Sequence, residues 1–181
     1  MQRFWQRLTI ARQTAPQPCV FCDHANLETN GILYEDDQVM AFRDKHPRAT
    51  AHILVVPKNH IESTANLTPS HASIGTHHDT SIPSSHVTLL HVVEHMLNIG
   101  KDVLHQECLR LGHVPSKPAV FGFHQPPFNS INHLHLHCLA PPFLPSWNEL
   151  RYIETPLLRN FITADSLLLQ ASAARPTSHC K

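Results

Sequence analysis

The sequence has few charged residues and no excess of either sign. Charged residues make up 15% of the 181, and fourteen Lys+Arg balance fourteen Asp+Glu, so the formal net charge is zero. Proteins whose main task is to hold nucleic acid or anionic membrane non-specifically carry a positive excess, and this composition argues against that class. The length suits one domain with appendages, and 41% hydrophobic residues suffice for one core.

Long apolar stretches are also missing. No run of apolar residues approaches the length needed to cross a bilayer, which excludes a transmembrane protein. No secretory signal with an apolar stretch and a small-residue cleavage site is found, so the five cysteines favour a reducing compartment over a disulfide framework. We therefore expect a cytoplasmic or nuclear protein. Residues 1–18 are Arg-rich and free of acidic residues, which favours either a mitochondrial transit peptide or a short disordered extension.

Short apolar segments and one long periodic segment predict the fold class. The predicted strands cover residues 33–34, 39–42, 53–56, 119–123 and 133–139, and the predicted helices cover about 87–111 and 164–174. Residues 141–145 are rich in proline and are expected to leave the sheet. Short strands around one long helix favour an α+β fold with a mostly antiparallel sheet. We expect one domain over 19–168 with a polar insertion at about 62–86, and a tail over 169–181.

Histidine is abundant, with 17 residues, and three of them alternate in one strand. In His133-Leu134-His135-Leu136-His137-Cys138-Leu139, strict alternation sends the imidazoles to one face and Leu134, Leu136 and Cys138 to the other. At a rise of about 3.3 Å per residue, neighbouring histidines lie roughly 6–7 Å apart on that face. Such spacing suits several contacts to one small group, such as a phosphate.

This motif resembles the signature of the histidine triad (HIT) superfamily, His-x-His-x-His with apolar residues between. Other stretches are similar in order to the branch of histidine triad nucleotide-binding proteins, and they cover residues 36–44, 52–61, 122–132 and 161–165. The resemblance implies a HIT-like α+β domain, usually a homodimer, with a purine nucleotide as its ligand. It also implies a hydrolase that releases AMP from adenosine 5′-monophosphoramidates and similar adenylates, with no cofactor needed for the chemistry and no membrane or nucleic acid as partner.

The same resemblance implies roles for individual residues. His135 would be the nucleophile and form a covalent nucleotidyl-imidazole, which divides one displacement into two easier steps. A backbone carbonyl would hold the tautomer of His135, while His137 and Ser130 would contact the phosphate and assist the leaving group. His52, beside them, and His133, the first histidine of the triad, would complete the catalytic residues. Nucleotide-binding positions match Val20, Phe21, Phe42 and Asp44, with Asp44 on the ribose hydroxyls. Two further positions depart from the family pattern, since Lys45 replaces an apolar contact to the base and His124 lies near a position that is otherwise Asn.

The pair Cys19-x-x-Cys22 raises the question of a metal. Zinc needs four Cys or His ligands in a structural site, and one such pair supplies two. In some relatives the other two ligands resemble His60 and His133. The resemblance thus implies a structural zinc site of Cys19, Cys22, His60 and His133, and two reduced thiols at a turn are the alternative.

Other functions remain open at this point. His91-Val92-Val93-Glu94-His95 matches the inverted zinc-peptidase signature H-x-x-E-H, although 17 histidines make chance matches common. Removal of AMP from adenylated DNA ends, as in aprataxin-like hydrolases, is an alternative within the superfamily. A nucleotide-binding regulatory module without an enzymatic role is the alternative from another class.

Overall fold

Six strands form one antiparallel sheet in the computed structural model, which describes residues 19–29, 31–67 and 84–173. The strand order is β1-β2-β3-β5-β4-β6, and each neighbouring pair is antiparallel. The strands are β1 (Ile32–Glu35), β2 (Val39–Arg43), β3 (Ala49–Pro57), β4 (Val120–His124), β5 (Leu136–Phe143) and β6 (Phe161–Thr163). This confirms the α+β class with a mostly antiparallel sheet.

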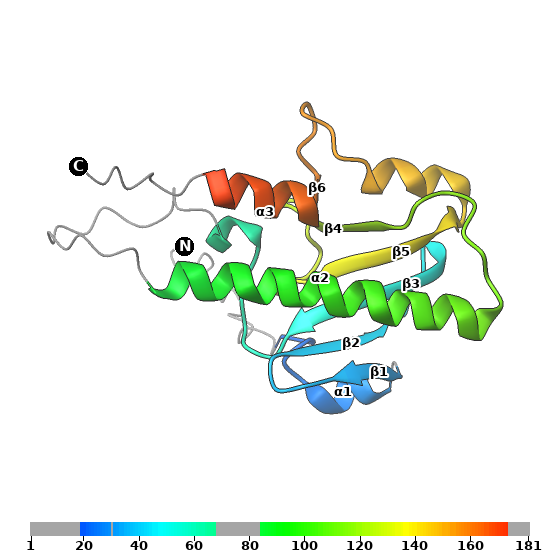
Figure 1. The fold of residues 1–181 in the computed structure, drawn as a ribbon, viewed down its shortest axis with the longest axis horizontal. Helices are drawn as coiled ribbons and strands as arrows, with labels where there is room; N and C mark the ends of the chain where they lie inside the picture. The colour runs from blue at the N-terminus through cyan, green and yellow to red at the C-terminus, as the bar shows by residue number, and fades with distance from the viewer. Residues whose placement is uncertain (1–18, 30, 68–83, 174–181) are drawn as a thin grey trace, which may run out of the picture.

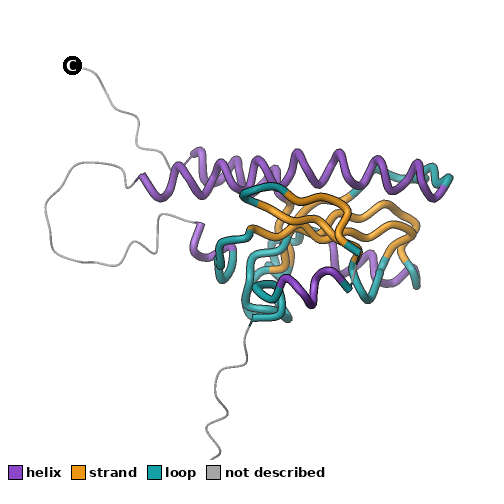
Figure 2. Tube along the Cα trace, turned by 90° about the horizontal axis from the view of Figure 1, so that it is seen from below, coloured by secondary structure: helices purple, strands orange, loops and turns teal. Residues whose placement is uncertain are grey.

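Among the described residues, three α-helices and two 3-10 helices surround the sheet. They are α1 (His24–Glu28), α2 (Ser84–Leu111), α3 (Ala164–Ala173), η1 (Thr64–Leu67) and η3 (Ser146–Tyr152). The long helix α2 runs along one face of the sheet and packs against α3, while α1 and η3 lie toward the other face (Figures 1 and 2). None of the described helices is long and apolar enough to span a membrane.

Alternation along the strands divides the side chains between the two faces. One face packs under Val93, Met96 and Leu97 of α2, and it comprises Val39, Ala41, Ile53, Val55, Leu136 and Cys138. The residues between them point the other way and form two smaller clusters, around Phe42 and Leu54 and around Leu139 and Tyr152. Because successive side chains of an extended strand point to opposite faces, the triad histidines lie on the face opposite α2, as the sequence predicts.

Strand β5 differs from its predicted position. Proline was expected to end the strand after Leu139, yet β5 continues to Phe143, so the prediction that 141–145 leaves the sheet is wrong for 141–143. Strand β4 pairs with β5 only as far as Leu139, whereas β3 accompanies β5 to Phe143. The pairing of β3 with β5 also shifts register between Ala49 and Ala51, opposite Pro141 and Pro142. Because the nitrogens of two consecutive residues point to opposite edges of a strand, one proline faces the unpaired edge and the other faces this irregularity, and neither removes a regular ladder hydrogen bond. At the other end, residues 133–135 precede the paired strand.

The predicted insertion at 62–86 lies partly outside the described residues. Its beginning forms η1, where Ser63 and Thr64 are buried, and its end belongs to α2, which starts at Ser84. The predicted extension over 1–18 lies outside the described residues altogether. At the C-terminal end, α3 continues to Ala173, so a domain boundary at 168 falls inside a helix.

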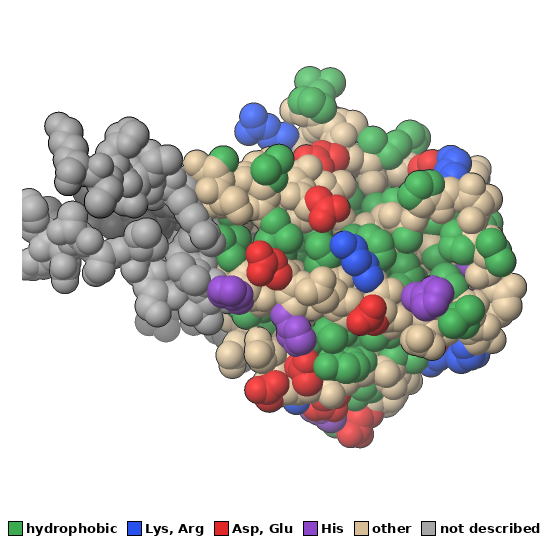
Figure 3. Space-filling model, viewed as in Figure 1, with side chains coloured by type: hydrophobic (Ala, Val, Ile, Leu, Met, Phe, Trp, Pro, Cys, Tyr) green, Lys and Arg blue, Asp and Glu red, His purple; other side chains and the backbone are tan. Residues whose placement is uncertain are grey.

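The face that carries α2 and α3 has interspersed acidic, basic and histidine side chains, with hydrophobic side chains between them (Figure 3). One contact on this side joins α2 to the turn between β1 and β2. Asp36 accepts hydrogen bonds from the backbone N–H groups of Gln38 and Val39 and lies 2.6 Å from Nε2 of His95. The carboxylate therefore closes the turn and fixes the helix against it.

Candidate functional site

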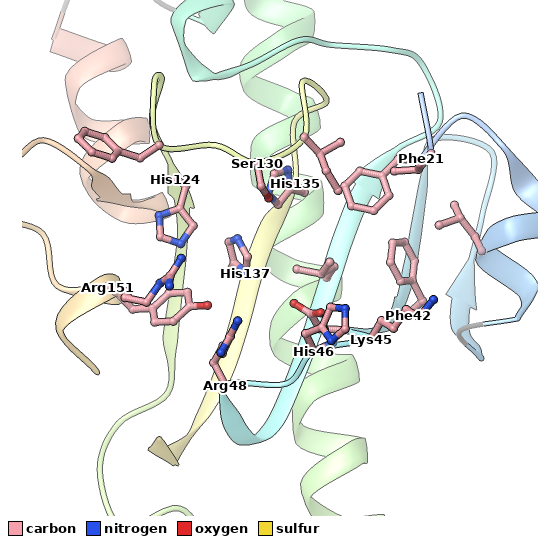
Figure 4. Close-up of a pocket in the computed structure, with 17 residues that line it drawn as sticks. Phe21, Phe42, Lys45, His46, Arg48, His124, Ser130, His135, His137 and Arg151 are labelled. Atoms are coloured by element: carbon pink, nitrogen blue, oxygen red, sulfur yellow. Dashed lines mark hydrogen bonds between the residues drawn. The ribbon is translucent and has the colours of Figure 1, made fainter. Parts of the chain in front are cut away.

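A line of rings crosses the sheet face opposite α2. Phe42 contacts Phe21 with ring centroids 5.7 Å apart, and Phe21 contacts His135 at 5.5 Å. The line continues from His135 to His137 at 5.0 Å and from His137 to Tyr152 at 5.4 Å. The two triad rings are thus closer than the expected 6–7 Å. Figure 4 shows His135 and His137 between Phe21 on one side and Arg151 on the other.

The tautomer of His135 is set by the backbone. Its Nδ1 lies 2.6 Å from the carbonyl oxygen of His133, which can only accept, so Nδ1 carries the proton and donates. The other nitrogen, Nε2, therefore keeps its lone pair. Since His135 lines the pocket, this geometry presents an unprotonated nitrogen to a ligand. The carbonyl partner that the resemblance implies is present.

A chain of hydrogen bonds fixes His52 and His137 in turn. The backbone N–H of Arg48 donates to Nδ1 of His52 at 3.2 Å, which places the proton of His52 on Nε2. This Nε2–H then donates to Nδ1 of His137 at 2.9 Å. The proton of His137 is consequently on Nε2, which is buried and has no hydrogen-bond partner among the described residues. Asp44 also lies 3.3 Å from Nδ1 of His52, a contact that would be an ion pair only with a protonated imidazole.

Burial keeps the central imidazoles neutral. Desolvation lowers the pKa of His135, and it lowers the pKa of His137 well below its ordinary value, with His135 and His52 adding to the effect. Desolvation lowers the pKa of His52 to about 4, although nearby Asp44 opposes it. Neutral imidazole is the nucleophilic form, so the site holds a competent nucleophile near neutral pH.

We expect the free energy of unfolding to fall as the pH drops from about 6.5 to about 4. The pKa values of His52 and His137 are lower in the folded chain, so the unfolded chain takes up protons that the folded chain does not. Above pH 6.5 both histidines are neutral in the folded and in the unfolded chain, so the free energy of unfolding has its full value there. Below pH 6.5 each histidine lowers the free energy of unfolding by up to about 1.4 kcal/mol per pH unit. Urea unfolding at a series of pH values measures this slope. A His52→Gln variant with the same slope as wild type would contradict the assignment.

A pocket of about 390 Å³ opens over the triad, a size that accommodates a small ligand. Seventeen residues line it (Figure 4). Its apolar wall comprises Val20, Phe21, Leu27, Phe42, Leu54, Phe128 and Ile131, and its polar wall comprises Asp44, Lys45, His46, Arg48, His124, Ser130, His135, His137, Arg151 and Tyr152. All six predicted nucleotide-binding positions and Ser130 thus line one pocket with His135 and His137. His52 lies behind His137, and His133 points away toward the N-terminal segment.

Four residues of the polar wall have no counterpart in the sequence prediction. Arg48 and His46 come from the loop between β2 and β3, and Arg151 and Tyr152 come from η3, after the triad strand. The Tyr152 ring stacks on Phe143 and contacts His52, and burial raises the pKa of Tyr152 to about 12. No local sequence motif marks these four residues. Arg151 and Tyr152, for example, reach the pocket only because the turn after β5 places η3 beside it.

The four predicted metal ligands converge. Their ligand atoms lie within 4.8 Å of one another, and the three closest S–N pairs are 3.3, 3.3 and 3.5 Å apart. Zinc at about 2.3 Å from sulfur and about 2.0 Å from nitrogen holds tetrahedral S and N ligands roughly 3.5 Å apart. In addition, Nε2 of His133 donates to the carbonyl of Pro57 at 2.9 Å, which leaves Nδ1 as a lone pair facing the thiols. The residues Cys19, Cys22, His60 and His133 therefore fit a structural zinc ion.

Two other groups fit a metal poorly. Asp44, His52 and His137 are close together, but the hydrogen bond between the two imidazoles already uses one nitrogen of each. In the inverted peptidase signature, the His91 side chain is exposed and lies 3.7 Å from Glu94, while His95 is held by Asp36. Within the described part of the chain, no group of candidate ligand atoms includes His91 or His95. The structure thus gives the peptidase alternative no support.

Comparisons with known proteins agree with this geometry. A family model described as scavenger mRNA decapping enzyme C-term binding matches residues 18–81 and 74–153. The bifunctional adenosine 5′-phosphosulfate phosphorylase/adenylylsulfatase HINT4 of Arabidopsis thaliana is 38% identical over 153 residues, which are 84% of this chain and 90% of that protein. The adenosine 5′-monophosphoramidase HINT3 of Xenopus tropicalis is 33% identical over 162 residues, covering 86% and 88%. A solved histidine triad protein from Clostridium difficile is 27% identical with a TM-score of 0.49, covering 70% and 92%. On its sequence relatives, the chain belongs to the histidine triad (HIT) family.

Proposed function

We propose that this protein is a hydrolase of adenosine 5′-monophosphoramidates and similar adenylates that releases AMP through a nucleotidyl-His135 intermediate. One observation carries the proposal: the 2.6 Å hydrogen bond from Nδ1 of His135 to the His133 carbonyl, which leaves Nε2 as a neutral nucleophile in the pocket. The names of the relatives from Arabidopsis thaliana and Xenopus tropicalis, a phosphorylase/adenylylsulfatase and a monophosphoramidase, support an adenylate as substrate.

The reaction has two displacements at the α-phosphorus. In the first, Nε2 of His135 forms a bond to phosphorus and the bond to the leaving nitrogen breaks. The buried Nε2–H of His137 donates toward the phosphate, and Ser130 adds a hydroxyl at the rim. The leaving nitrogen takes up one proton as it departs, and the water that attacks the intermediate releases one. The proton balance therefore closes over the two steps.

The apolar end of the pocket receives the base. Phe21 and Phe42 are buried and tilted by 53° to each other, with Val20 at the rim, so they offer aromatic faces to a purine. Asp44 lines the same pocket, where its carboxylate can accept from both ribose hydroxyls. This arrangement orders base, ribose and phosphate from Phe42 toward His137.

Three further parts of the proposal concern the surroundings of the site. A zinc ion held by Cys19, Cys22, His60 and His133 would be structural, because all four positions are protein ligands and none is open to substrate. The functional unit is a homodimer in the cytoplasm or nucleus, with a mitochondrial location as the alternative for the Arg-rich N-terminus. None of these parts forms or breaks a bond in the reaction at His135.

The first test is an AMP-release assay with adenosine 5′-phosphoramidate. We expect turnover, and after rapid acid quenching we expect mass spectrometry to find a nucleotidyl group on the peptide that contains His135. A folded protein that binds AMP but releases none would favour the regulatory-module function instead. Release of AMP only from adenylated DNA ends would favour the aprataxin-like function.

A further inference from the structure

The two cysteines of the predicted metal site differ from the other described cysteines in their surroundings. Cys22 is exposed and Cys19 is partly exposed, whereas Cys108 and Cys138 are buried in the core under α2. A reagent that arrives from solvent meets the first pair and is kept from the second by the packing of the core. Among the described cysteines, Cys19 and Cys22 are therefore the pair open to chemical modification.

The backbone brings the sulfurs of this pair within reach of a bond. The N–H of Cys22 donates to the carbonyl oxygen of Cys19 at 3.0 Å, which closes a four-residue turn. The first and last Cα atoms of such a turn lie less than about 7 Å apart, and a disulfide needs a Cα–Cα distance of about 4.4–6.8 Å. The two sulfurs themselves lie within 4.8 Å of each other. A disulfide can therefore join them without a change in the path of the chain outside the turn.

A proton acceptor lies beside both sulfurs. Because Nε2 of His133 donates to the carbonyl of Pro57, Nδ1 carries a lone pair, and it lies 3.3 Å from Sγ of Cys19 and 3.5 Å from Sγ of Cys22. An imidazole in this position accepts the proton of a thiol and leaves the thiolate, which is the reactive form. A bound zinc ion would likewise hold both sulfurs as thiolates.

The same turn carries part of the pocket wall. Val20 and Phe21 are the two residues between the cysteines, and both line the pocket. The side chain of Phe21 is buried, and its ring contacts Phe42 at 5.7 Å and His135 at 5.5 Å. A disulfide shortens the sulfur–sulfur distance to about 2.0 Å from the roughly 3.8 Å expected around a tetrahedral metal. Only two residues are available to absorb this contraction, so we expect the ring of Phe21 to move with it.

We propose that Cys19 and Cys22 are a redox-sensitive pair, which a peroxide converts into a reversible disulfide that displaces Phe21 and lowers the affinity of the pocket for AMP. The inference rests on the proposed function only in taking AMP as the ligand of the pocket. A compartment that keeps thiols reduced suits such a pair, because disulfides that form there are transient.

The oxidation by hydrogen peroxide takes two steps. The sulfur of Cys22, the more exposed of the two, attacks a peroxide oxygen, so that a sulfur–oxygen bond forms, the oxygen–oxygen bond breaks and one water leaves. The sulfur of Cys19 then attacks the sulfenic acid, so that the disulfide forms, the sulfur–oxygen bond breaks and a second water leaves. The two sulfurs lose two electrons to the peroxide oxygens, and the two thiol protons end in the two waters. Because neither sulfur of a disulfide is a thiolate, the oxidised pair no longer holds a metal.

The test treats the full chain with hydrogen peroxide and measures disulfides and AMP affinity separately. The parent protein carries Cys180→Ser, because Cys180 lies outside the described residues and could otherwise pair with Cys22. Peptide mass spectrometry after alkylation of the remaining thiols locates the disulfide, and calorimetry measures the Kd of AMP. We expect a disulfide between Cys19 and Cys22 and a Kd about tenfold above that of the reduced protein, the size of one lost aromatic contact. Dithiothreitol should reverse both changes.

Three controls isolate the disulfide. Cys108→Ala removes a buried cysteine and should respond to peroxide as the parent does. Cys22→Ser cannot form the disulfide, so its AMP affinity should not respond. Reduced parent treated with chelator loses any metal but forms no disulfide, and its AMP affinity should fall less than that of the oxidised protein. This last control needs no substitution at the pair and so does not depend on the stability of a variant.

The outcomes separate this inference from the proposed function. Sulfurs that stay reduced, or a disulfide that leaves the AMP affinity unchanged, would overturn the redox-sensitive pair and leave the hydrolase function in place. An equal loss of affinity in peroxide-treated Cys22→Ser, or in the reduced protein with chelator, would do the same, because the disulfide would then not be its cause. Reduced, folded protein that binds no AMP would overturn both.

Discussion

Replacing His135 by alanine is expected to lower AMP release by on the order of 10⁴-fold, because this removes the atom that bonds to phosphorus. The neighbouring imidazole cannot take over. His137 holds its proton on Nε2 and its lone pair toward His52, so this ring offers no unprotonated nitrogen to the phosphate. Single-turnover release of AMP, measured at saturating enzyme, separates the loss of chemistry from any loss of binding.

Two controls make the His135→Ala result interpretable. The variant should still bind AMP, since Phe21 and Phe42 and the Asp44 carboxylate are unchanged, and calorimetry measures this. His91→Ala, which removes an exposed imidazole from α2, should keep wild-type turnover and so exclude a general effect of removing histidine. Turnover of His135→Ala within tenfold of wild type would refute the nucleophile assignment.

Loss of the metal is expected to have the largest effect on stability. Purified without added zinc, the protein should contain about one zinc ion per chain by elemental analysis. Cys22→Ser and His60→Ala should each lose the ion and lower stability by about 3 kcal/mol, or roughly 6–12 °C in Tm. The physical reason is that two thiols and two imidazoles converge within 4.8 Å. Burial and the neighbouring Cys19 raise the pKa of the Cys22 thiol, so the thiolate form needs a cation.

A matched substitution tests whether the effect belongs to the metal. His105→Ala removes an exposed histidine of α2 outside the group of ligands and should leave both zinc content and Tm unchanged. Strong chelator should lower the Tm of wild type toward that of Cys22→Ser and leave the variant unaffected. Wild type that is purified without metal and whose Tm does not rise when zinc is added would instead support two reduced thiols at a turn.

The triad and the carbonyl that holds His135 could be predicted from the sequence, because the contacts between them are local and the direction of the side chains follows from the alternation along a strand. His135 receives its tautomer from the carbonyl two residues earlier, and the alternation of His133–Leu139 follows from the period of an extended chain. The same logic failed for the end of β5. Whether a proline fits depends on whether the strand edge that its nitrogen faces is regularly paired. The neighbours of β5 decide this, with a register shift on the β3 side and no β4 partner beyond Leu139.

Residues brought in by distant elements could not be predicted. Arg48 and Arg151 are more than 100 positions apart in the sequence, and they meet only because β3 and β5 are neighbours in the sheet. Tyr152 also reaches His137 through the fold, with no motif to mark it. In the sequence, Arg48 and Arg151 are indistinguishable from ordinary surface residues and Tyr152 from an ordinary core residue. Their lack of ion-pair partners in the described chain becomes visible only with the tertiary structure.

His133 links the N-terminal segment to the reacting imidazole. Its ring faces Cys19 at 3.3 Å, and its backbone carbonyl receives the hydrogen bond from Nδ1 of His135. Val20 and Phe21, which form part of the pocket wall, stand between the two cysteines in the sequence. A displacement of this turn therefore acts both on the wall that receives the base and on the carbonyl that orients His135. We expect substitutions near Cys19 to change nucleotide affinity and the rate of bond formation together, which makes a turn at the edge of the fold a determinant of both.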